Sequence, residues 1–466
     1  MTVRDLPVLT GTLRSRTARY VEDERLRSSL ARATDAFEER KAAAFAQFED
    51  PDAVRDAARA AKADVLQHLD VIVERLADRL EAAGAIVHWA RTDEEARAEV
   101  RRVARERGAR RVVKSKSMLS EEIGLNESLE QDGVEVTETD LGEWIIQIAG
   151  EAPSHIIVPA IHKDRAQVRE ILQRVARGDL SDVPAELAAF ARRELRERFL
   201  RADLGISGVN FAVAETGTLV LVTNEGNGRL TTSVPPVHVA LLGMERVVET
   251  WAQLDLLLAL LPRAATGQPI TTYVSAITGP RRDGEHDGPE ELHVVIVDNR
   301  RSDLLGTEFA EMLACIRCGA CLNVCPVYRQ TGGHAYGWVY PGPMGAVLTP
   351  LLLEAEGAAE VPNASSLCAA CWKACPVGIP LQDMLLALRR RAAEDARFGE
   401  RAAWAAWAAA WSRPWSYRVS LRLASMASRM FDPARVPGPP QRWALGRETP
   451  SPARRTFREL WRAEQR

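Results

Sequence analysis

Seven cysteines, the only ones in the chain, are confined to two short runs. The first run reads CIRCGACLNVCP and places four thiols ahead of Pro326, at Cys315, Cys318, Cys321 and Cys325. The second run reads CAACWKACP and places three thiols ahead of Pro376, at Cys368, Cys371 and Cys375. Gaps of two, two and three residues before a Cys-Pro pair are typical of bacterial ferredoxin-type iron–sulfur sites. We therefore predict iron–sulfur chemistry.

The order of the cysteines also predicts how they are shared. In two-cluster ferredoxins the cysteine before the proline binds the other cluster. For this chain the rule gives a first cluster bound by Cys315, Cys318, Cys321 and Cys375. It gives a second cluster bound by Cys325, Cys368 and Cys371. Neither run would complete a site alone.

The second cluster is one thiolate short. A full second copy of the motif would have cysteine at Ser365. The centre is then either a three-iron cluster or a four-iron cluster with an oxygen ligand from Ser365, water or a partner. We favour four irons, and so two [4Fe-4S] clusters. Ligation by His334 is a further alternative, although a packed loop histidine is the more ordinary interpretation. Structural zinc also uses Cys-x2-Cys pairs, but the four-cysteine run favours iron.

Bulk composition limits the class of protein. The chain has 466 residues, 46% hydrophobic and 27% charged, with a net charge of -3, which indicates a globular protein of two or three domains and no nucleic-acid surface. No signal peptide and no apolar run of about 18 residues is evident. Closely spaced thiols without a disulfide framework favour a reducing compartment, so we expect a cytoplasmic location.

The elements that must hold these cysteines follow from hydrophobic periodicity. We predict a helical region over 1–84, with two helices between 15 and 84 and a cap signal at Asp50. An α/β domain over 85–305 should alternate strands with helices around a mainly parallel sheet. We expect its strands at 85–90, 110–115, 134–139 and 155–160, and its helices at 93–108, 117–131, 163–177 and 251–265.

Two further regions complete the predicted order. We expect an α-helical two-cluster ferredoxin-type domain over 306–395 and a C-terminal helical region with a Pro/Arg-rich tail over 396–466. In that last region Trp404, Trp407 and Trp411 share one helical face. Such a stripe could dock on a partner or lie at a membrane surface, but packing against the chain's own helices is the ordinary explanation. Poor packing is expected from Pro433 onward.

A glycine-containing loop offers a candidate anion or substrate site. The loop TNEGNGRL follows an apolar strand and contains Asn224, Glu225, Gly226, Asn227, Gly228 and Arg229. Its glycines would let backbone N–H groups approach a carboxylate, phosphate or nucleotide. Lys114 and Lys116, between a strand and a helix, could join it. A polar turn and solvated lysines are the alternative explanations.

Several long motifs resemble the lactate-utilization protein B family. The run from Cys315 to Leu352, CIRCGACLNVCPVYRQTGGHAYGWVYPGPMGAVLTPLL, is the closest match, and KSKSMLSEEIGLNESL (114–129), GEWIIQIAGEAPSHIIVPAIHKDR (142–165) and AETGTLVLVTNEGNGRL (214–230) extend it over nearly the whole chain. The three-cysteine second motif is also similar to the family's.

The resemblance implies an α/β fold similar to the sugar-phosphate isomerase and CoA-transferase superfamily. It also implies two companion subunits, one cysteine-rich and one a smaller relative of the α/β domain, that act with this chain in converting L-lactate to pyruvate. The chain would then be the electron-transfer subunit of a lactate dehydrogenase complex that does not use NAD, since no G-x-G-x-x-G motif opens a βαβ unit. An iron–sulfur subunit for another 2-hydroxy acid such as glycolate, or a redox- and metabolite-sensing protein, are the alternatives.

Overall fold

The computed structural model describes residues 9–353, 355, 357–394, 398–430 and 455–465, and the single residues 432, 435, 437, 441 and 444. The chain forms two compact units, Met1–Arg389 and Arg390–Arg466, and each is described by itself. The structure divides the chain into two units, so the four domains expected from the sequence stay a prediction.

Four helices, rather than the two predicted, form the N-terminal region. They are α1 (Leu13–Val21), α2 (Glu24–Phe45), α3 (Pro51–Gln67) and α4 (Leu69–Ala82). The first break follows from Asp23, whose side chain accepts the Leu26 N–H and so starts a new helix. The second break lies at His68. The predicted cap at Asp50 is confirmed, because its carboxylate accepts the N–H groups of Asp52 and Ala53.

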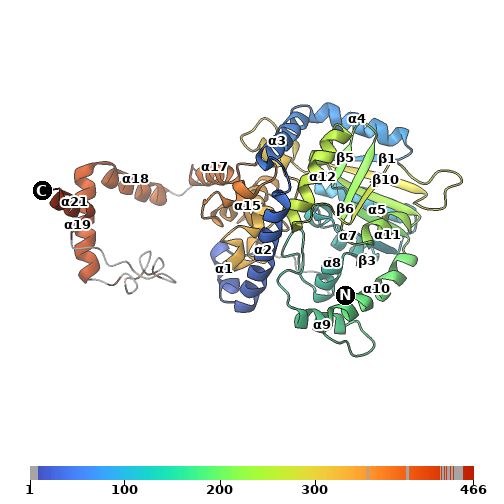
Figure 1. The fold of residues 1–466 in the computed structure, drawn as a ribbon, viewed down its shortest axis with the longest axis horizontal. Coiled ribbons are helices and arrows are strands. Elements are labelled where there is room, and N and C mark those ends of the chain that lie inside the picture. Colours follow the sequence, from blue (N-terminus) through green and yellow to red (C-terminus); the bar gives the residue numbers. More distant parts are fainter. Residues whose placement is uncertain are drawn as a thin grey trace. The chain divides into compact units, whose positions relative to one another are not determined.

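A six-stranded, all-parallel sheet in the order β1-β10-β7-β4-β2-β3 forms the centre of the first unit (Figure 1). Its strands are β1 (Ile86–Ala90), β2 (Arg111–Lys114), β3 (Glu135–Glu138), β4 (Leu204–Gly208), β7 (Val237–Gly243) and β10 (Glu291–Val297). Lys114 is opposite Ile206, and Gly208 is opposite Leu241, so the carboxyl ends of β2, β4 and β7 meet at one edge. The predicted mainly parallel sheet is confirmed.

Helices cover both faces of this sheet. On one face, α5 (Asp93–Glu106) and α7 (Leu125–Gln131) pack on apolar side chains such as Val295 and Val297 of β10. On the other face, α4 packs on alternate β10 side chains, including Val294 and Ile296. Strands buried on both faces are expected to be mainly apolar, and β7 and β10 are so except for the buried His238 and His293 and for Glu291 at the start of β10. The predicted helix 117–131 is divided at Gly124, whose φ of 61° ends α6 (Met118–Glu122).

The segment HIIVPA, predicted as a strand at 155–160, was wrongly assigned. It forms a buried loop, in which the His155 Nδ1 atom accepts the N–H groups of Ile157 and Val158 at 3.0 and 3.2 Å. The ring thus satisfies backbone donors that a strand would pair with a neighbour. The helices α8 (Leu141–Ala149), α9 (Arg165–Gln173) and α10 (Pro184–Leu200) surround this loop region in sequence, and α8 and α10 were not predicted.

A smaller mixed sheet connects the α/β core to the cysteine region. Its order is β8-β5-β6-β9. The strands are β5 (Phe211–Val213), β6 (Thr218–Thr223), β8 (Val247–Val248) and β9 (Tyr273–Ile277). Ala212 of β5 packs toward α4, whereas Phe211 and Val213 pack in the same cluster as α12 (Trp251–Thr266) and the cysteine loops. The sheet therefore lies between two hydrophobic cores.

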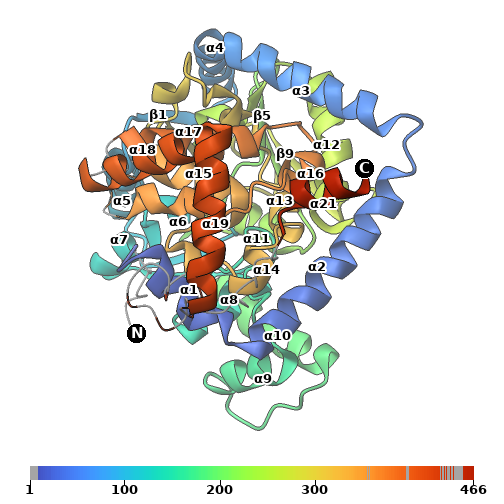
Figure 2. The same cartoon turned by 90° about the vertical axis from the view of Figure 1, so that its left-hand side faces the viewer.

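Short helices build the cysteine region. They are η3 (Ala310–Ala314), α13 (Ala320–Asn323), α14 (Tyr328–Thr331), η4 (His334–Tyr336), α15 (Gly342–Leu352), η5 (Ala358–Asn363), α16 (Ala370–Ala374) and α17 (Leu381–Glu394). The helices α13 and α16, each preceding the last cysteine of its run, pack against each other (Figure 2). They share one core with α2, α12 and the small sheet. The cysteine loops are thus held by packing from distant parts of the chain.

The second unit contains α18 (Phe398–Ser412), α19 (Pro414–Met430) and α21 (Phe457–Glu464). Trp404, Trp407 and Trp411 form a row of contacting rings on α18, and their residues remain 62%, 51% and 44% exposed. Among the helices that the structure describes, none is long and apolar enough to cross a membrane. The tail expected from Pro433 onward lies largely outside the described residues.

Candidate metal centre and the adjoining cavity

The last cysteine of the second run lies with the first three of the first run. Cys315, Cys318, Cys321 and Cys375 line one small, mainly apolar cavity. Cys318 precedes Gly319, the N-cap of α13, and Cys321 lies within that helix, while Cys375 is the C-cap of α16. The contact between α13 and α16 therefore brings the fourth thiol to the other three.

The remaining three cysteines form a second group. Besides burial, the charge of Cys368 raises the pKa of both Cys325 and Cys371, and the charge of Cys325 also raises the pKa of Cys371. Cys325 follows α13, whereas Cys371 lies within α16, so each run contributes to both groups. Cys368 is the exposed member, while Cys325 and Cys371 are buried.

The two cysteine loops share an unusual backbone geometry. Arg317 and Gly319, on either side of Cys318, have φ values of 58° and 77°. Leu367 and Ala369, on either side of Cys368, have φ values of 55° and 61°. Side chains other than glycine rarely adopt this left-handed conformation, and such strain is concentrated at functional sites. The loops are therefore structural copies that align Cys318 with Cys368.

The same alignment places Ser365 at the position of Cys315. The Ser365 hydroxyl accepts the Leu367 N–H at 3.1 Å, and its carbonyl accepts Arg389 Nη2 at 2.7 Å. Arg389 also donates to the Pro362 carbonyl at 3.0 Å. Ser365 is thus held in a defined loop at the corner where the second group has no thiol.

Burial and crowding act on the first group of thiols. Burial, with the charge of Cys375, raises the pKa of Cys318 to about 12, and burial with the neighbouring thiolates raises the pKa of Cys321 well above its usual range. A backbone N–H from Ile379 points at the Cys375 sulfur, 3.4 Å away. Four convergent sulfurs that repel one another as thiolates, and that receive N–H groups, suit a cationic iron core. The residues present therefore fit an iron–sulfur cluster.

Buried cations lie next to Cys315. Arg246 Nη1 donates to the Cys315 carbonyl at 3.1 Å. Lys62 donates to the Glu245 carbonyl at 2.7 Å, and burial together with the charge of Arg246 lowers its pKa to about 8. These groups place positive charge beside the first cysteine group, which would stabilise the negative charge of a thiolate-bound cluster.

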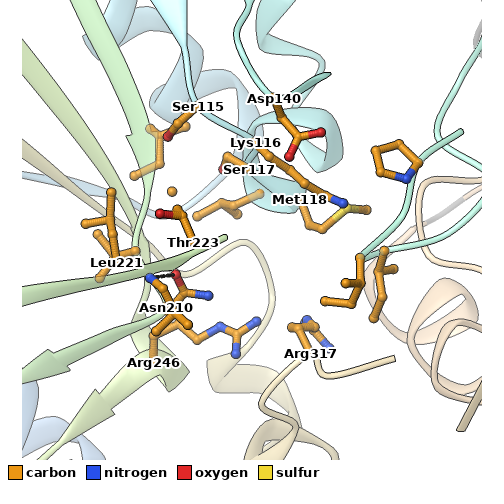
Figure 3. A pocket seen from close by; sticks show the side chains of 18 of the residues that line it. Ser115, Lys116, Ser117, Met118, Asp140, Asn210, Leu221, Thr223, Arg246 and Arg317 are labelled. Carbon is orange, nitrogen blue, oxygen red and sulfur yellow. Dashed lines mark hydrogen bonds between the residues drawn. The ribbon is translucent and has the colours of Figure 1, made fainter. Parts of the chain in front are cut away.

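A cavity of about 380 Å³ adjoins this group at the carboxyl ends of β2, β4 and β7 (Figure 3). Crevices at this end of parallel strands are the usual ligand sites of open α/β sheets. Ser115, Lys116 and Ser117 line the cavity from the end of β2, and Arg317 and Tyr340 line it from the cysteine region. Ile156 lines both this cavity and the smaller one among the cysteines.

The structure brings only part of the predicted anion site to this cavity. Lys116, Asn224, Glu225 and Asn227 are among the residues that line it. Burial, with the Asp140 carboxylate, raises the pKa of Glu225 to about 7. The glycines at 226 and 228 do not line the cavity; Gly226 instead precedes α11 (Asn227–Ser233), so the loop is a helix start and not a glycine-rich cradle.

Two of the predicted cationic residues lie elsewhere. Lys114 is 1% exposed, and its ammonium donates to Glu121 at 2.7 Å and lies 2.8 Å from the Glu138 carboxylate. It is therefore part of a buried ion pair and does not line the cavity. Arg229 is on the surface, where it pairs with Asp287 at 2.9 Å.

The arginines of the cavity were not among the site residues predicted from the sequence. Arg246 follows β7, and Arg317 lies inside the first cysteine motif, where it looks like a spacer. A third, Arg301, donates to both Glu122 oxygens at 2.9 Å and to Glu245 at 2.7 Å. A signal was available in the position of Arg246, because charged residues directly after parallel strands share one edge of the sheet.

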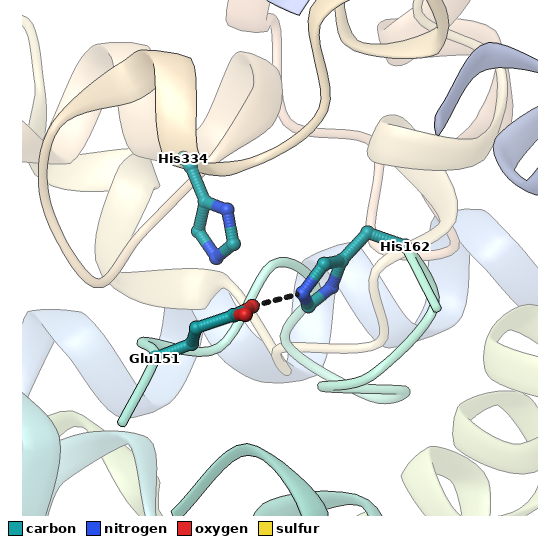
Figure 4. Close-up of side chains that lie close together, drawn as sticks. All are labelled: Glu151, His162 and His334. Atoms are coloured by element: carbon teal, nitrogen blue, oxygen red, sulfur yellow. Dashed lines mark hydrogen bonds and ion pairs between the residues drawn. The ribbon is translucent and has the colours of Figure 1, made fainter. Parts of the chain in front are cut away.

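A separate cluster of Glu151, His162 and His334 has potential ligand atoms within 4.8 Å of one another (Figure 4). Glu151 accepts from Lys163 at 2.5 Å and bonds His162 Nε2 at 2.7 Å. His334 Nε2 bonds the Ala152 carbonyl at 2.7 Å, and burial, with the neighbouring His162, lowers its pKa to about 4. We interpret this cluster as a polar contact between the cysteine region and the loop after α8, which gives His334 a packing role.

The fold and the cysteine groups define an iron–sulfur protein in which a two-run cysteine region is built onto a parallel α/β domain. Three family models match the chain: "LUD domain" over 73–297, "4Fe-4S dicluster domain" over 311–379, and "Lactate utilisation protein B, C-terminal" over 387–466. The chain belongs to the lactate utilization protein B family, as the resemblance in its motifs predicted.

Curated relatives match along nearly their whole length. A protein named "Lactate utilization protein B" from Shouchella clausii is 46% identical over 458 residues, 97% of this chain and 96% of the relative. The protein of the same name from Bacillus subtilis is 42% identical over 463 residues, 98% and 96% of the two chains. A solved DUF162 family protein from Deinococcus radiodurans is 17% identical and covers 49% of this chain and 98% of its own, with a TM-score of 0.29, too low to add to the fold assignment.

Proposed function

We propose that this chain is the iron–sulfur electron-transfer subunit of a complex that oxidises L-lactate to pyruvate. The observation that carries the proposal is the crossing of the two cysteine runs into two groups of thiols beside a parallel α/β domain. The name shared by the curated relatives, "Lactate utilization protein B", supports the choice of lactate.

The proposed ligands follow the two groups. The first cluster is held by Cys315, Cys318, Cys321 and Cys375. The second is held by Cys325, Cys368 and Cys371, and its remaining corner lies at the loop of Ser365. Both are proposed as [4Fe-4S] clusters, which supply one-electron transfer. Because α13 separates Cys321 from Cys325 by a single helical turn, one short element positions ligands of both centres.

Two centres suit the chemistry of the substrate. Oxidation of L-lactate to pyruvate releases two electrons and two protons, whereas iron–sulfur centres accept electrons singly. The protein's own contribution is to hold the sulfurs, to bury them, and to place Arg246 and Lys62 beside Cys315. Positive groups near the sulfurs favour the more negative, reduced state of a cluster.

The proposal includes two companion subunits, one cysteine-rich and one a smaller relative of the α/β domain, and a cytoplasmic location. The exposed tryptophan row on α18 supports a partner, because large apolar side chains left in water are a common sign of an interaction surface. Electrons would pass one at a time from this chain through the complex to an acceptor located elsewhere in the complex.

The test is anaerobic co-purification of the assembled complex, followed by addition of L-lactate or glycolate while the visible and EPR spectra are recorded. Reduction of the clusters by L-lactate, with pyruvate formed in the ratio of one per two electrons, is expected. Reduction by glycolate alone would assign a different 2-hydroxy acid. No reduction by either acid, in a complex with full iron content, would contradict the electron-transfer role.

Variants test the crossed ligand sets. Cys375→Ala is expected to remove the same EPR signal as Cys318→Ala, although the two residues lie in different runs. Cys325→Ala is expected to remove the same signal as Cys371→Ala. If Cys375→Ala and Cys371→Ala instead lost one common signal, each run would build its own centre and the assignment would be wrong.

A further inference from the structure

The cavity at the carboxyl edge of the sheet contains buried cationic side chains with N–H groups that lack a hydrogen-bond acceptor, although the Arg317 guanidinium lies over the Tyr340 ring, 4.7 Å from its centroid. Within the described chain, the Arg317 Nε and Nη1 atoms and the Lys116 Nζ atom are buried without a hydrogen-bond partner. Arg317 is 9% exposed and lines the cavity. Leaving a buried charged donor unsatisfied is costly, and native proteins rarely do so without a functional reason. Such donors indicate a ligand.

The nearby carboxylates do not satisfy these cations. Glu143 is 3.9 Å from Lys116 Nζ, beyond hydrogen-bond distance. Glu245 is 3.6 Å from Arg317 and 3.7 Å from Arg246, but its short contact of 2.7 Å is with Arg301. Glu245 thus lies near three guanidinium groups, of which Arg301 also bonds Glu122. Arg246 and Arg317 have no carboxylate within hydrogen-bond distance in the described chain.

A cluster at Cys315 accounts for only some of these cations. The thiolate charge of Cys315 acts on Arg246 and Arg317, and Arg246 also bonds the Cys315 carbonyl. Lys116 is different, since the charges that act on it are those of Glu143, Asp140, Glu121 and Glu138, with no cysteine among them. These carboxylates supply negative charge, but within the described chain Lys116 Nζ has no hydrogen-bond acceptor, so an acceptor for its N–H groups would have to come from the cavity.

We propose that this cavity binds a small organic acid, whose carboxylate is held by Lys116, Arg246 and Arg317. Figure 3 shows Arg246 and Arg317 at one side of the cavity and Lys116 with Asp140 at another, around a common space. Guanidinium groups hold carboxylates through paired N–H donors, and a lysine adds a point charge. None of the three belongs to the cysteine ligand sets.

The other polar groups that line the cavity indicate which class of organic acid would bind. Ser115, Ser117, Asn210 and Asp140 present hydroxyl, amide and carboxylate groups to the same space. A hydroxyl group next to the ligand's carboxylate would donate to Asp140, and an oxo group would accept from Ser115 or Ser117. The lining thus fits a 2-hydroxy acid and the corresponding 2-oxo acid. The choice of lactate and pyruvate as probes rests on the proposed function, but the cation cluster does not.

The proposed acid site lies next to the first cysteine group. Ile156 contributes to the wall of this cavity and to that of the cavity among Cys315, Cys318, Cys321 and Cys375. Arg317 lies between Cys315 and Cys318 in the chain and reaches the acid site with its guanidinium. An acid bound here would lie in a cavity that shares Ile156 as a lining residue with the cavity of the first cysteine group.

Calorimetric titration of the anaerobic, iron-replete single chain tests the proposal without any electron transfer. The probes are L-lactate, pyruvate, inorganic phosphate and chloride. L-lactate and pyruvate are expected to bind, and Lys116→Met is expected to weaken both by about ten- to a hundredfold, the loss of one charge-assisted hydrogen bond. Lys116→Arg should recover most of the affinity. Arg229→Gln, which removes a surface cation outside the cavity, is the matched control and should change nothing.

Asp140→Asn provides a second variant that does not remove a cation. It keeps an acceptor for the α8 N-terminus, where Asp140 bonds the Glu143 N–H, and removes a negative charge from the cavity. Pyruvate, which has no hydroxyl to donate to Asp140, is expected to bind severalfold more tightly to this variant. Iron content and circular dichroism show whether each variant is folded.

Three outcomes would overturn the proposal: no binding of either organic acid, equal binding by phosphate and chloride, or unchanged affinity in both Lys116→Met and Asp140→Asn. A different result would show that only the electron-transfer role is wrong. Lactate would then bind the single chain with the expected dependence on Lys116, while the assembled complex would show no lactate-dependent cluster reduction.

Discussion

Ser365 occupies the one corner of the duplicated cysteine loops that has no sulfur. Its place could be predicted, because counting back three residues from Cys368 in the repeat leads directly to it. The loop copies in the structure, with left-handed residues on both sides of Cys318 and of Cys368, support the same alignment. The Ser365 hydroxyl already accepts the Leu367 N–H, which leaves a lone pair for iron.

Substitution at Ser365 should therefore change only the second centre. Ser365→Cys supplies a fourth thiolate, and we expect a second cluster with full four-iron content and greater resistance to oxygen. Ser365→Ala should alter the EPR signal of the second cluster if the hydroxyl is a ligand. The signal of the first cluster is the internal control. Identical spectra and iron content in the parent, Ser365→Ala and Ser365→Cys proteins would show that this corner is not at residue 365.

Glu225 gives the cavity a dependence on pH. Burial and the Asp140 carboxylate raise the pKa of Glu225 to about 7, so this side chain is largely neutral at pH 6 and largely charged at pH 8. The charged form repels a bound carboxylate. We expect the affinity for pyruvate to fall severalfold as the pH rises from 6 to 8, and Glu225→Gln to remove most of that fall.

The groups facing Glu225 set the control for this experiment. Asp140 and Lys116 act on it, and the Leu141 N–H donates to it at 3.3 Å. Glu143, whose pKa burial raises to about 8, and Lys116, whose pKa burial lowers, would add a second decline at higher pH that persists in Glu225→Gln. A Glu225→Gln protein that keeps the full decline below pH 7.5 would assign the effect to that pair instead.

Elements of the α/β domain differ in how far the sequence predicts them. The strands β1, β2 and β3 and the helices α5 and α12 follow from runs of apolar residues at a clear period. The strand predicted at HIIVPA was wrong because β-branched residues also suit a buried loop. The ring of His155 satisfies the backbone donors of that loop. Of the arginine cluster, only the position of Arg246 after β7 gave a signal; the other members follow β10 or lie within a cysteine loop, and no local pattern links them.

A buried ion-pair network joins these elements. Arg301 follows β10, Glu122 ends α6 and Glu245 follows β7, while Tyr340 of the cysteine region donates to Glu122 at 2.6 Å. Arg301 and Glu245 are each 2% exposed. Removing one partner from such a network leaves an uncompensated buried charge.

Arg301→Met should therefore destabilise the first unit by about 3–5 kcal/mol. The measurement is anaerobic urea unfolding of the iron-replete protein, followed by circular dichroism and by the visible cluster bands. Arg229→Gln, at an exposed ion pair, is the control and should cost no more than about 1 kcal/mol. A loss in Arg301→Met no larger than the control's would show that the network does not hold the elements together.

The two units of the chain differ in net charge. Residues 390–466 contain sixteen arginines against seven acidic residues, a net charge of +9, although the complete chain carries -3. The first unit is thus acidic and the second strongly basic. All seven cysteines and the cavity lie in the first unit. The second unit instead exposes tryptophans and arginines, a composition suited to recognition.

A chain that ends after Glu394 should keep its iron–sulfur centres. We expect unchanged iron content, visible spectrum and pyruvate affinity, because the described contacts of the cysteine loops are within residues 9–394. The truncated chain should bind its companion subunits at least tenfold more weakly, with less dependence on salt. Loss of either cluster on truncation would show that the second unit contributes to the metal sites.

The exchange of Cys325 and Cys375 between the two groups has a consequence for biosynthesis. Until the ribosome has made the second run, the nascent chain holds the four cysteines of the first run, and neither group of thiols is complete. With the ligand sets proposed above, a chain terminated between the two runs would lack Cys375 of the first set and both Cys368 and Cys371 of the second, so we expect such a fragment to hold neither cluster.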